Sequence, residues 1–173
     1  MATSTVEVFI GLGSNARPVG HLKHACLALG EVLEDMRASE VYASEAIGGG
    51  AAYLNMVVRG RTTLAPEALI ATLKTIEQAT GRVRGQPEVT LDLDLLCYGD
   101  LVSAPLRLPR RDVLEYAFVL RPLADLAPDH RHPLTGQRFV EHWREASAGM
   151  ADLTRRGRLE TLAEAPGAHG DER

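Results

Sequence analysis

The amino-acid sequence predicts an α+β fold, with a ferredoxin-like β-α-β-β-α-β core, an antiparallel sheet and extra C-terminal helices. Segments rich in β-formers and segments with apolar residues at helical spacing follow one another in that order, separated by glycine-rich stretches. The 173 residues suffice for one well-filled core but not for two ordinary domains. We therefore expect a single domain over residues 1–148 and a flexible tail over 149–173.

The first half of the core is expected to hold three strands and one helix. Residues 6–10 are rich in β-branched and aromatic side chains and predict a buried strand, which the glycine-rich segment 11–15 ends in a tight turn. Apolar residues at three- and four-residue steps over 22–33 predict the first helix. The second and third strands are expected over 36–42 and 53–59.

The second half of the core is expected to begin with a helix that has Pro66 in its first turn and ends at Gly81. A fourth strand follows over 90–98. Two further short helices are expected over 118–126 and 139–146.

Composition limits the partners and the compartment. A net charge of −4 argues against a nucleic-acid partner, since such proteins attract phosphate backbones with a basic surface. No apolar run approaches the roughly 20 residues that cross a bilayer, so we expect no membrane association. Two cysteines without metal-finger spacing and a start without signal-peptide features favour the cytoplasm. The oligomeric state, monomer or homodimer, stays open.

Two aspartates in the fourth strand predict a metal site. Side chains two apart in a strand share a face, so Asp92 and Asp94 point one way while Leu91 and Leu93 point to the core. Adjacent carboxylates repel each other unless a cation neutralises them, and Mg²⁺ prefers one or two carboxylates together with substrate phosphates. The alternative is an exposed strand face that carries two aspartates by chance.

Cationic side chains near this strand in the sequence suggest that the metal accompanies phosphates. Four arginines lie in turns that flank the acidic strand: Arg82, Arg84, Arg110 and Arg111. Guanidinium groups suit phosphate oxygens, although each arginine alone could be a solvated surface residue. Lys74 and Glu77, on the last turns of the second helix, fit either a nucleotide site or the solvated surface.

An ordered set of motifs resembles the pterin pyrophosphokinase family of folate synthesis, over residues 6–145. In chain order, the motifs are Phe9-Ile10-Gly11-Leu12-Gly13-Ser14-Asn15, Tyr53-Leu54-Asn55, Ile76-Glu77, Gly81-Arg82-Val83-Arg84, Thr90-Leu91-Asp92-Leu93-Asp94 and Ala117-Phe118-Val119-Leu120-Arg121-Pro122-Leu123. The family's fold is ferredoxin-like. The resemblance implies a diphosphotransferase that passes pyrophosphate from ATP to 6-hydroxymethyl-7,8-dihydropterin and releases AMP.

The resemblance also implies roles for individual residues. Asp92 and Asp94 would hold two Mg²⁺ ions, and Arg82 and Arg84 would assist catalysis. Five residues would bind the pterin, with Tyr53 and Phe118 on either side of the ring: Ser44, Ile47, Tyr53, Asn55 and Phe118. Six residues would bind the nucleotide: Lys74, Glu77, Arg84, Arg110, Arg111 and Tyr116.

The sequence departs from the family mainly on the nucleotide side. The loop over 85–89 is shorter than the family's and lacks its tryptophan and arginine, Arg110 replaces a histidine, and Tyr116 replaces an arginine. Lys74 replaces a glutamine. These changes leave an alternative open: a pterin-binding paralogue with weakened or lost kinase activity, acting as a binding or regulatory protein or in another pterin pathway.

Overall fold

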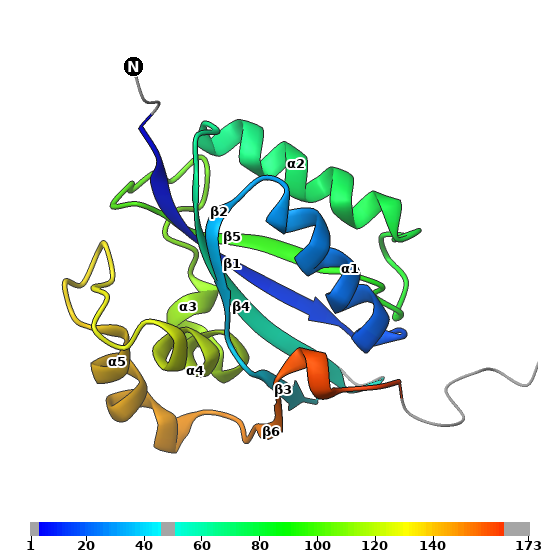
Figure 1. The fold of residues 1–173 in the computed structure, drawn as a ribbon. Coiled ribbons are helices and arrows are strands. Elements are labelled where there is room, and N and C mark those ends of the chain that lie inside the picture. The colour runs from blue at the N-terminus through cyan, green and yellow to red at the C-terminus, as the bar shows by residue number, and fades with distance from the viewer. Residues whose placement is uncertain (1–3, 46–50, 165–173) are drawn as a thin grey trace, which may run out of the picture.

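The computed structural model describes residues 4–45 and 51–164, which form one sheet with helices on both faces (Figure 1). The strands are β1 (Val6–Ser14), β2 (Glu34–Ala38), β3 (Val41–Ser44), β4 (Tyr53–Thr62), β5 (Asp92–Tyr98) and β6 (Thr154–Gly157). The helices are α1 (Pro18–Gly30), α2 (Pro66–Ala79), α3 (Asp112–Glu115), α4 (Ala117–Leu126) and α5 (Phe139–Ala146). Two 3₁₀ turns lie at Ser147–Gly149 and Leu159–Thr161.

The sheet confirms the predicted α+β, ferredoxin-like class. Its strand order is β5-β1-β4-β3-β6, β2 also pairs with β4, and each pairing is antiparallel. Helices α1 and α2 lie on one face, while α3, α4 and α5 lie on the other (Figure 1). Within residues 4–45 and 51–164, no helix is long and apolar enough to span a bilayer.

Alternation along the strands produces a separate core on each face of the sheet. Val8, Ile10 and Leu12 of β1 join the core under α1 and α2, whereas Phe9 joins the core under α4 and α5. Leu120 of α4 is fully buried in that second core. Both helix layers are therefore anchored through the same central strand.

The helix predictions agree with the structure, although α1 spans 18–30 where 22–33 was expected. Helix α2 has Pro66 at its first turn, and the chain leaves it at Gly81, whose φ of 80° is costly for a residue with a Cβ. Helix α4, observed over 117–126, was expected over 118–126, and α5 was expected over 139–146 as observed. The short helix α3 was not, since four residues carry too little periodicity to be recognised.

Two strand predictions need correction. The segment 11–15 is not a tight turn, because β1 continues to Ser14 and pairs with β4 and β5 along this stretch. The strand expected over 36–42 is divided into β2 and β3. Ser39 lies at the break, where its Oγ accepts a hydrogen bond from the Val57 N–H at 2.9 Å.

The expectation of a flexible tail from residue 149 is wrong for part of that segment. Strand β6 pairs with β3 at the edge of the sheet. Leu159, just beyond β6, is 6% exposed and belongs to the core beside α1. The residues of β6 are charged or small and show no strand pattern, so the sequence did not predict it. Only its pairing with β3 defines the strand.

Candidate active site at the junction of two cavities

The register of three strands forms the floor of a cavity. Gly13 of β1 lies between Asn55 of β4 and Asp92 of β5, and Gly11 lies between Val57 and Asp94 in the neighbouring row. The two glycines have no side chains to fill the space above them. Neighbouring strands are about 5 Å apart, so each row spans roughly 10 Å across the floor.

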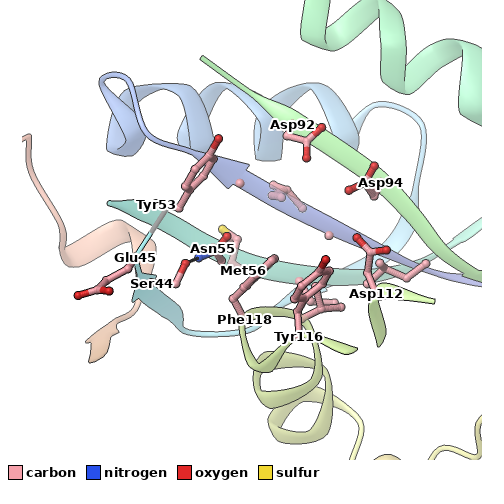
Figure 2. Close-up of a pocket in the computed structure, with 16 residues that line it drawn as sticks. Ser44, Glu45, Tyr53, Asn55, Met56, Asp92, Asp94, Asp112, Tyr116 and Phe118 are labelled. Atoms are coloured by element: carbon pink, nitrogen blue, oxygen red, sulfur yellow. Dashed lines mark hydrogen bonds between the residues drawn. The ribbon is translucent and has the colours of Figure 1, made fainter. Parts of the chain in front are cut away.

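The smaller cavity, of about 300 Å³, lies over this floor (Figure 2). Its volume is at the lower end of the range typical of small-molecule sites. Aromatic rings and polar groups line it: Ser44, Tyr53, Asn55, Asp92, Asp94, Asp112, Tyr116 and Phe118. In Figure 2, Tyr53 and Phe118 lie on different sides of the cavity, and the aspartates lie at its far end from Ser44.

Asn55 is oriented by its own protein contacts. It is 5% exposed, and its Nδ2 donates to Ser44 Oγ at 2.8 Å and to the Tyr42 carbonyl at 3.4 Å. Both amide hydrogens are thereby used, which leaves Oδ1 as the acceptor that Asn55 can offer to a ligand. Because Ser44 Oγ already accepts a hydrogen bond, its hydroxyl hydrogen can be donated. This pair therefore presents one acceptor and one donor.

A larger cavity, of about 870 Å³, lies on the other side of the acidic strand. Basic side chains line it, together with the carboxylates it shares with the smaller cavity: Lys74, Arg82, Arg84, Arg107, Arg110, Asp92, Asp94 and Asp112. Two buried guanidinium nitrogens, Arg82 Nε and Arg110 Nε, have no hydrogen-bond partner among the described residues. Donors in this state suit an anion such as a phosphate.

Glu77 pairs with two of the basic side chains of the larger cavity, Arg82 and Arg84. Its buried carboxylate accepts the Leu93 N–H and an Nη1 hydrogen of Arg82, both at 3.2 Å, and lies 3.5 Å from Arg84 Nη2. Burial raises the pKa of Glu77, although these partners oppose the shift. Arg82 also donates to the Leu91 carbonyl at 2.9 Å, so its guanidinium is well fixed beside β5. Glu77 therefore acts as an anchor for the cavity wall.

The carboxylates of Asp92 and Asp94 stand where the two cavities meet. The leucines that alternate with them are buried, as expected from the strand pattern. Arg82 Nη1 lies 3.4 Å from Asp92, and Arg110 Nη2 lies 3.5 Å from Asp94. Burial, and then the neighbouring charge of Asp92, raise the pKa of Asp94 to about 7. Two ionised carboxylates are therefore costly here without a further cation.

Asp92 and Asp94 suit a cation that takes its remaining ligands from a substrate and from water. Within residues 4–45 and 51–164, no group of three or more His, Cys, Asp or Glu side chains could hold a metal. A metal bound by Asp92 and Asp94 would complete its shell with water and phosphate oxygens, which is the coordination that Mg²⁺ adopts.

Most of the residues singled out from the sequence line one of the two cavities. Ser44, Tyr53, Asn55 and Phe118 line the smaller, and Lys74, Glu77, Arg82, Arg84 and Arg110 line the larger. Ile47 lies outside the described residues.

Tyr116 and Arg111 do not lie where the nucleotide assignment placed them. Tyr116 lines the smaller cavity, where its ring stacks on Phe118 with centroids 4.9 Å apart. The extended backbone just before α4 directs it there. Arg111 lines neither cavity, because its side chain is 89% exposed and pairs with Glu115 one helical turn later.

Three features of the site were missed in the sequence. The glycines of the floor were assigned to a turn, although glycine at alternate positions after a β-rich run also fits a strand with one open face. Asp112 lies 18 residues beyond Asp94, and only the fold brings it to both cavities. Asn15 was given no role, yet it donates to the Pro87 carbonyl and accepts the Val89 N–H. It thereby ties the short loop before β5 to the end of β1.

Comparison with known proteins assigns the family. The family model described as 7,8-dihydro-6-hydroxymethylpterin-pyrophosphokinase (HPPK) matches residues 9–128. The chain belongs to the HPPK family. It is 41% identical over 140 residues to the 2-amino-4-hydroxy-6-hydroxymethyldihydropteridine pyrophosphokinase of Synechocystis sp., covering 76% of this chain and 72% of that protein. The same-named protein of Pseudomonas aeruginosa is 40% identical over 137 residues, covering 73% and 84%.

Solved structures agree on the fold. The wild-type Plasmodium falciparum HPPK-DHPS protein, crystallised with pteroate, superposes with a TM-score of 0.67 at 11% identity, over 86% of this chain and 45% of that chain. A variant of that protein crystallised with pterin gives a TM-score of 0.67 at 12% identity, over 85% and 45%. This HPPK-family chain thus spans less than half the length of those proteins, and at such identities the likeness shows the fold alone.

The charge at Asp94 leads to a prediction about stability. Its pKa in the folded protein, about 7, lies above the ordinary value of 3.8, so the folded state binds the proton more tightly than the unfolded state. Ionisation of Asp94 therefore lowers the stability of the metal-free protein progressively as pH rises from about 4 to about 7. Asp94→Asn, which cannot ionise, should raise the melting temperature of the metal-free protein at pH 8, and the gain should shrink toward pH 5.

Thermal unfolding in excess EDTA, at a series of pH values, measures this difference. Asp152→Asn is the matched control, since that side chain is exposed and lies outside both cavities. A lower melting temperature for Asp94→Asn than for the unsubstituted chain at pH 8 would contradict the electrostatic account.

Proposed function

We propose that this HPPK-family chain transfers pyrophosphate from ATP to 6-hydroxymethyl-7,8-dihydropterin, with Mg²⁺, and yields AMP and the pterin pyrophosphate. The observation that carries the proposal is the position of Asp92 and Asp94 at the junction of two cavities. One cavity suits a flat heterocycle and the other suits a polyanion. The names of the relatives from Synechocystis and Pseudomonas point to the same activity.

The smaller cavity fits the pterin in one orientation. The amide edge of the ring has an N–H donor beside a carbonyl acceptor, which complements Asn55 Oδ1 and the Ser44 hydroxyl. Tyr53 and Phe118 would contact the two ring faces through offset stacking, and the Tyr116 ring stacks on Phe118. With the amide edge at Asn55, the row through Gly13 directs the hydroxymethyl end of the substrate to Asp92.

The larger cavity fits the triphosphate. Lys74, Arg84 and Arg110 supply positive charge along its wall, and Arg82 is held beside Asp92. Asp92 and Asp94 would hold Mg²⁺, two ions by analogy with the family, and the metal would neutralise charge on the transferring group. Ile47 is proposed as a further pterin contact on the family resemblance alone.

The transfer itself requires positioning more than covalent help from the protein. The hydroxymethyl oxygen of the pterin attacks the β-phosphorus and loses its proton as the new O–P bond forms. The bond between the β-phosphorus and the α–β bridging oxygen breaks, and AMP leaves with that oxygen. Residues at the cavity junction hold the two reactants in line and stabilise the charge on the phosphoryl oxygens.

The alternative of a binding paralogue without kinase activity is not retained. It rested on the short loop over 85–89 and on the replaced arginine at Tyr116. Ser14 and Asn15 tie that loop to β1, and Tyr116 contributes to the ring-binding side, so neither change leaves a gap in the acidic junction.

Incubation of the purified protein with Mg-ATP and the hydroxymethyl-dihydropterin tests the proposal. AMP and pterin pyrophosphate should appear in equal amounts, and EDTA should stop their formation. Asp92→Asn and Asp94→Asn should each lower kcat at least about 100-fold, because the metal that stabilises the transferring group is lost, whereas pterin affinity should change little. ADP as the product, or no dependence on the two aspartates, would contradict the assignment.

The glycine floor yields a separate prediction for pterin affinity. A Cβ on residue 13 would lie 3.3 Å from Asn55 Oδ1, so Gly13→Ala should displace the amide and weaken pterin binding about tenfold, the effect of one impaired buried hydrogen bond. Gly30→Ala, where the added Cβ would have no atom within 4 Å apart from its chain neighbours and its own helix backbone, is the matched control. Calorimetric titration with the pterin measures both, and equal affinities would show that the floor has no role in binding.

A further inference from the structure

Arg110 lies between two carboxylates at the junction of the cavities. Its Nη2 is 3.5 Å from Asp94 Oδ1, and its Nε is 3.6 Å from Asp112 Oδ2. Both distances indicate ion pairs without well-formed hydrogen bonds, and the buried Nε has no hydrogen-bond partner in the part of the chain that is described. The backbone of Arg110 is anchored to β5 through its N–H, which donates to the Leu96 carbonyl at 2.8 Å. Its side chain is therefore held mainly by charge.

Arg82, which lies beside Asp92, is held more firmly than Arg110. Its Nη1 donates to the Leu91 carbonyl at 2.9 Å and to Glu77 at 3.2 Å, besides lying 3.4 Å from Asp92. Its side chain is 13% exposed, against 27% for Arg110. Of these two arginines, Arg110 has the looser contacts and the freer access to the larger cavity.

Asp112 is placed to hold Arg110, since its Oδ2 lies 3.6 Å from Arg110 Nε. Asp112 is the first residue of α3, and in Figure 2 its carboxylate points toward Asp94. It lines both cavities, so a guanidinium paired with it can reach either Asp94 or the space for phosphates.

We propose that Arg110 is an exchangeable counter-ion of Asp94. Without metal, its guanidinium neutralises part of the charge on Asp94. When a divalent cation binds with the nucleotide, Arg110 gives up Asp94, stays paired with Asp112 and turns its free N–H groups to the phosphate oxygens. Asp112 is then a positioning residue, acting through Arg110. The part of this inference that involves the nucleotide rests on the proposed function. The competition between Arg110 and a divalent metal for Asp94 does not.

Substitution of Arg110 has an unusual expected signature. Removing the positive charge of Arg110 should strengthen the binding of a metal cation alone, because the two cations no longer compete for Asp94. Coulomb interactions at this range are substantial even near the surface. The same substitution removes a phosphate donor and should weaken the binding of a metal-nucleotide complex. A purely structural role for Arg110 would weaken both.

The test uses two titrations on the whole protein. Mn²⁺, which also prefers oxygen ligands, is titrated without nucleotide and its free form is followed by electron paramagnetic resonance. Mg²⁺ with α,β-methylene-ATP, whose α–β bridge resists cleavage, is titrated by calorimetry. Arg110→Ala should bind Mn²⁺ at least about fivefold more tightly and the Mg²⁺ analogue complex at least about fivefold more weakly.

Two further variants complete the experiment. Asp112→Asn should weaken the analogue complex without tightening Mn²⁺, because Arg110 remains present but loses its anchor. Arg111→Ala is the matched control, as it removes the same charge one residue away from an exposed side chain paired with Glu115. It should change neither affinity by more than about twofold.

The outcomes separate this inference from the proposed function. If Arg110→Ala binds Mn²⁺ no more tightly than the unsubstituted chain, the proposed exchange is wrong even when the enzyme is active. The same holds if Arg111→Ala changes both affinities as much as Arg110→Ala does. If the unsubstituted chain forms no AMP, the proposed function is wrong. Tighter Mn²⁺ binding by Arg110→Ala would then still establish competition at Asp94.

Discussion

The pairing of β1 with β4 on one side and with β5 on the other places the main groups of the site. Antiparallel register sets Asn55, Gly13 and Asp92 in one row, and Val57, Gly11 and Asp94 in the next. A slip of one residue on β5 would exchange the aspartates for the buried leucines between them. The two cores on opposite faces of the sheet make such a slip costly, so hydrophobic packing indirectly sets the distance between ring recognition and the acidic pair.

Charge around this row alternates in sign. Glu77 stabilises Arg82 and Arg84, Arg82 lies against Asp92, and across the junction Arg110 lies between Asp94 and Asp112. Each carboxylate is partly neutralised before any ligand arrives, yet burial and Asp92 still raise the pKa of Asp94. The site is therefore preorganised to gain from a cation, which is how an electrostatic catalyst avoids reorganisation during the reaction.

Sequence reasoning succeeded where a local pattern decides the structure. Alternating aspartate and leucine placed the acidic face of β5 correctly, and helical periodicity with Pro66 and Gly81 defined α2. It failed where the pairing of distant strands decides the structure. The glycines of β1 form a floor only because β4 and β5 flank them, and β6 exists only through β3.

For individual site residues as well, local sequence motifs predicted some positions, and the fold alone determined others. Most residues carried over from the family resemblance line one of the two cavities, and their roles toward pterin and nucleotide stay predictions. Tyr116 lines the smaller cavity instead, and Arg111 points to solvent beside Glu115. Asp112 belongs to no local pattern, and its proximity to Asp94 depends on how the chain returns to the sheet after β5.

The most direct test of the central claim is a crystal structure with Mg²⁺, α,β-methylene-ATP and the hydroxymethyl-dihydropterin bound together. The account predicts metal ligated by Asp92 and Asp94, the ring amide edge at Asn55, and the hydroxymethyl oxygen roughly 3–3.5 Å from the β-phosphorus, in line with the bridging atom. Nucleotide bound outside the larger cavity, or metal that does not contact the two aspartates, would contradict it.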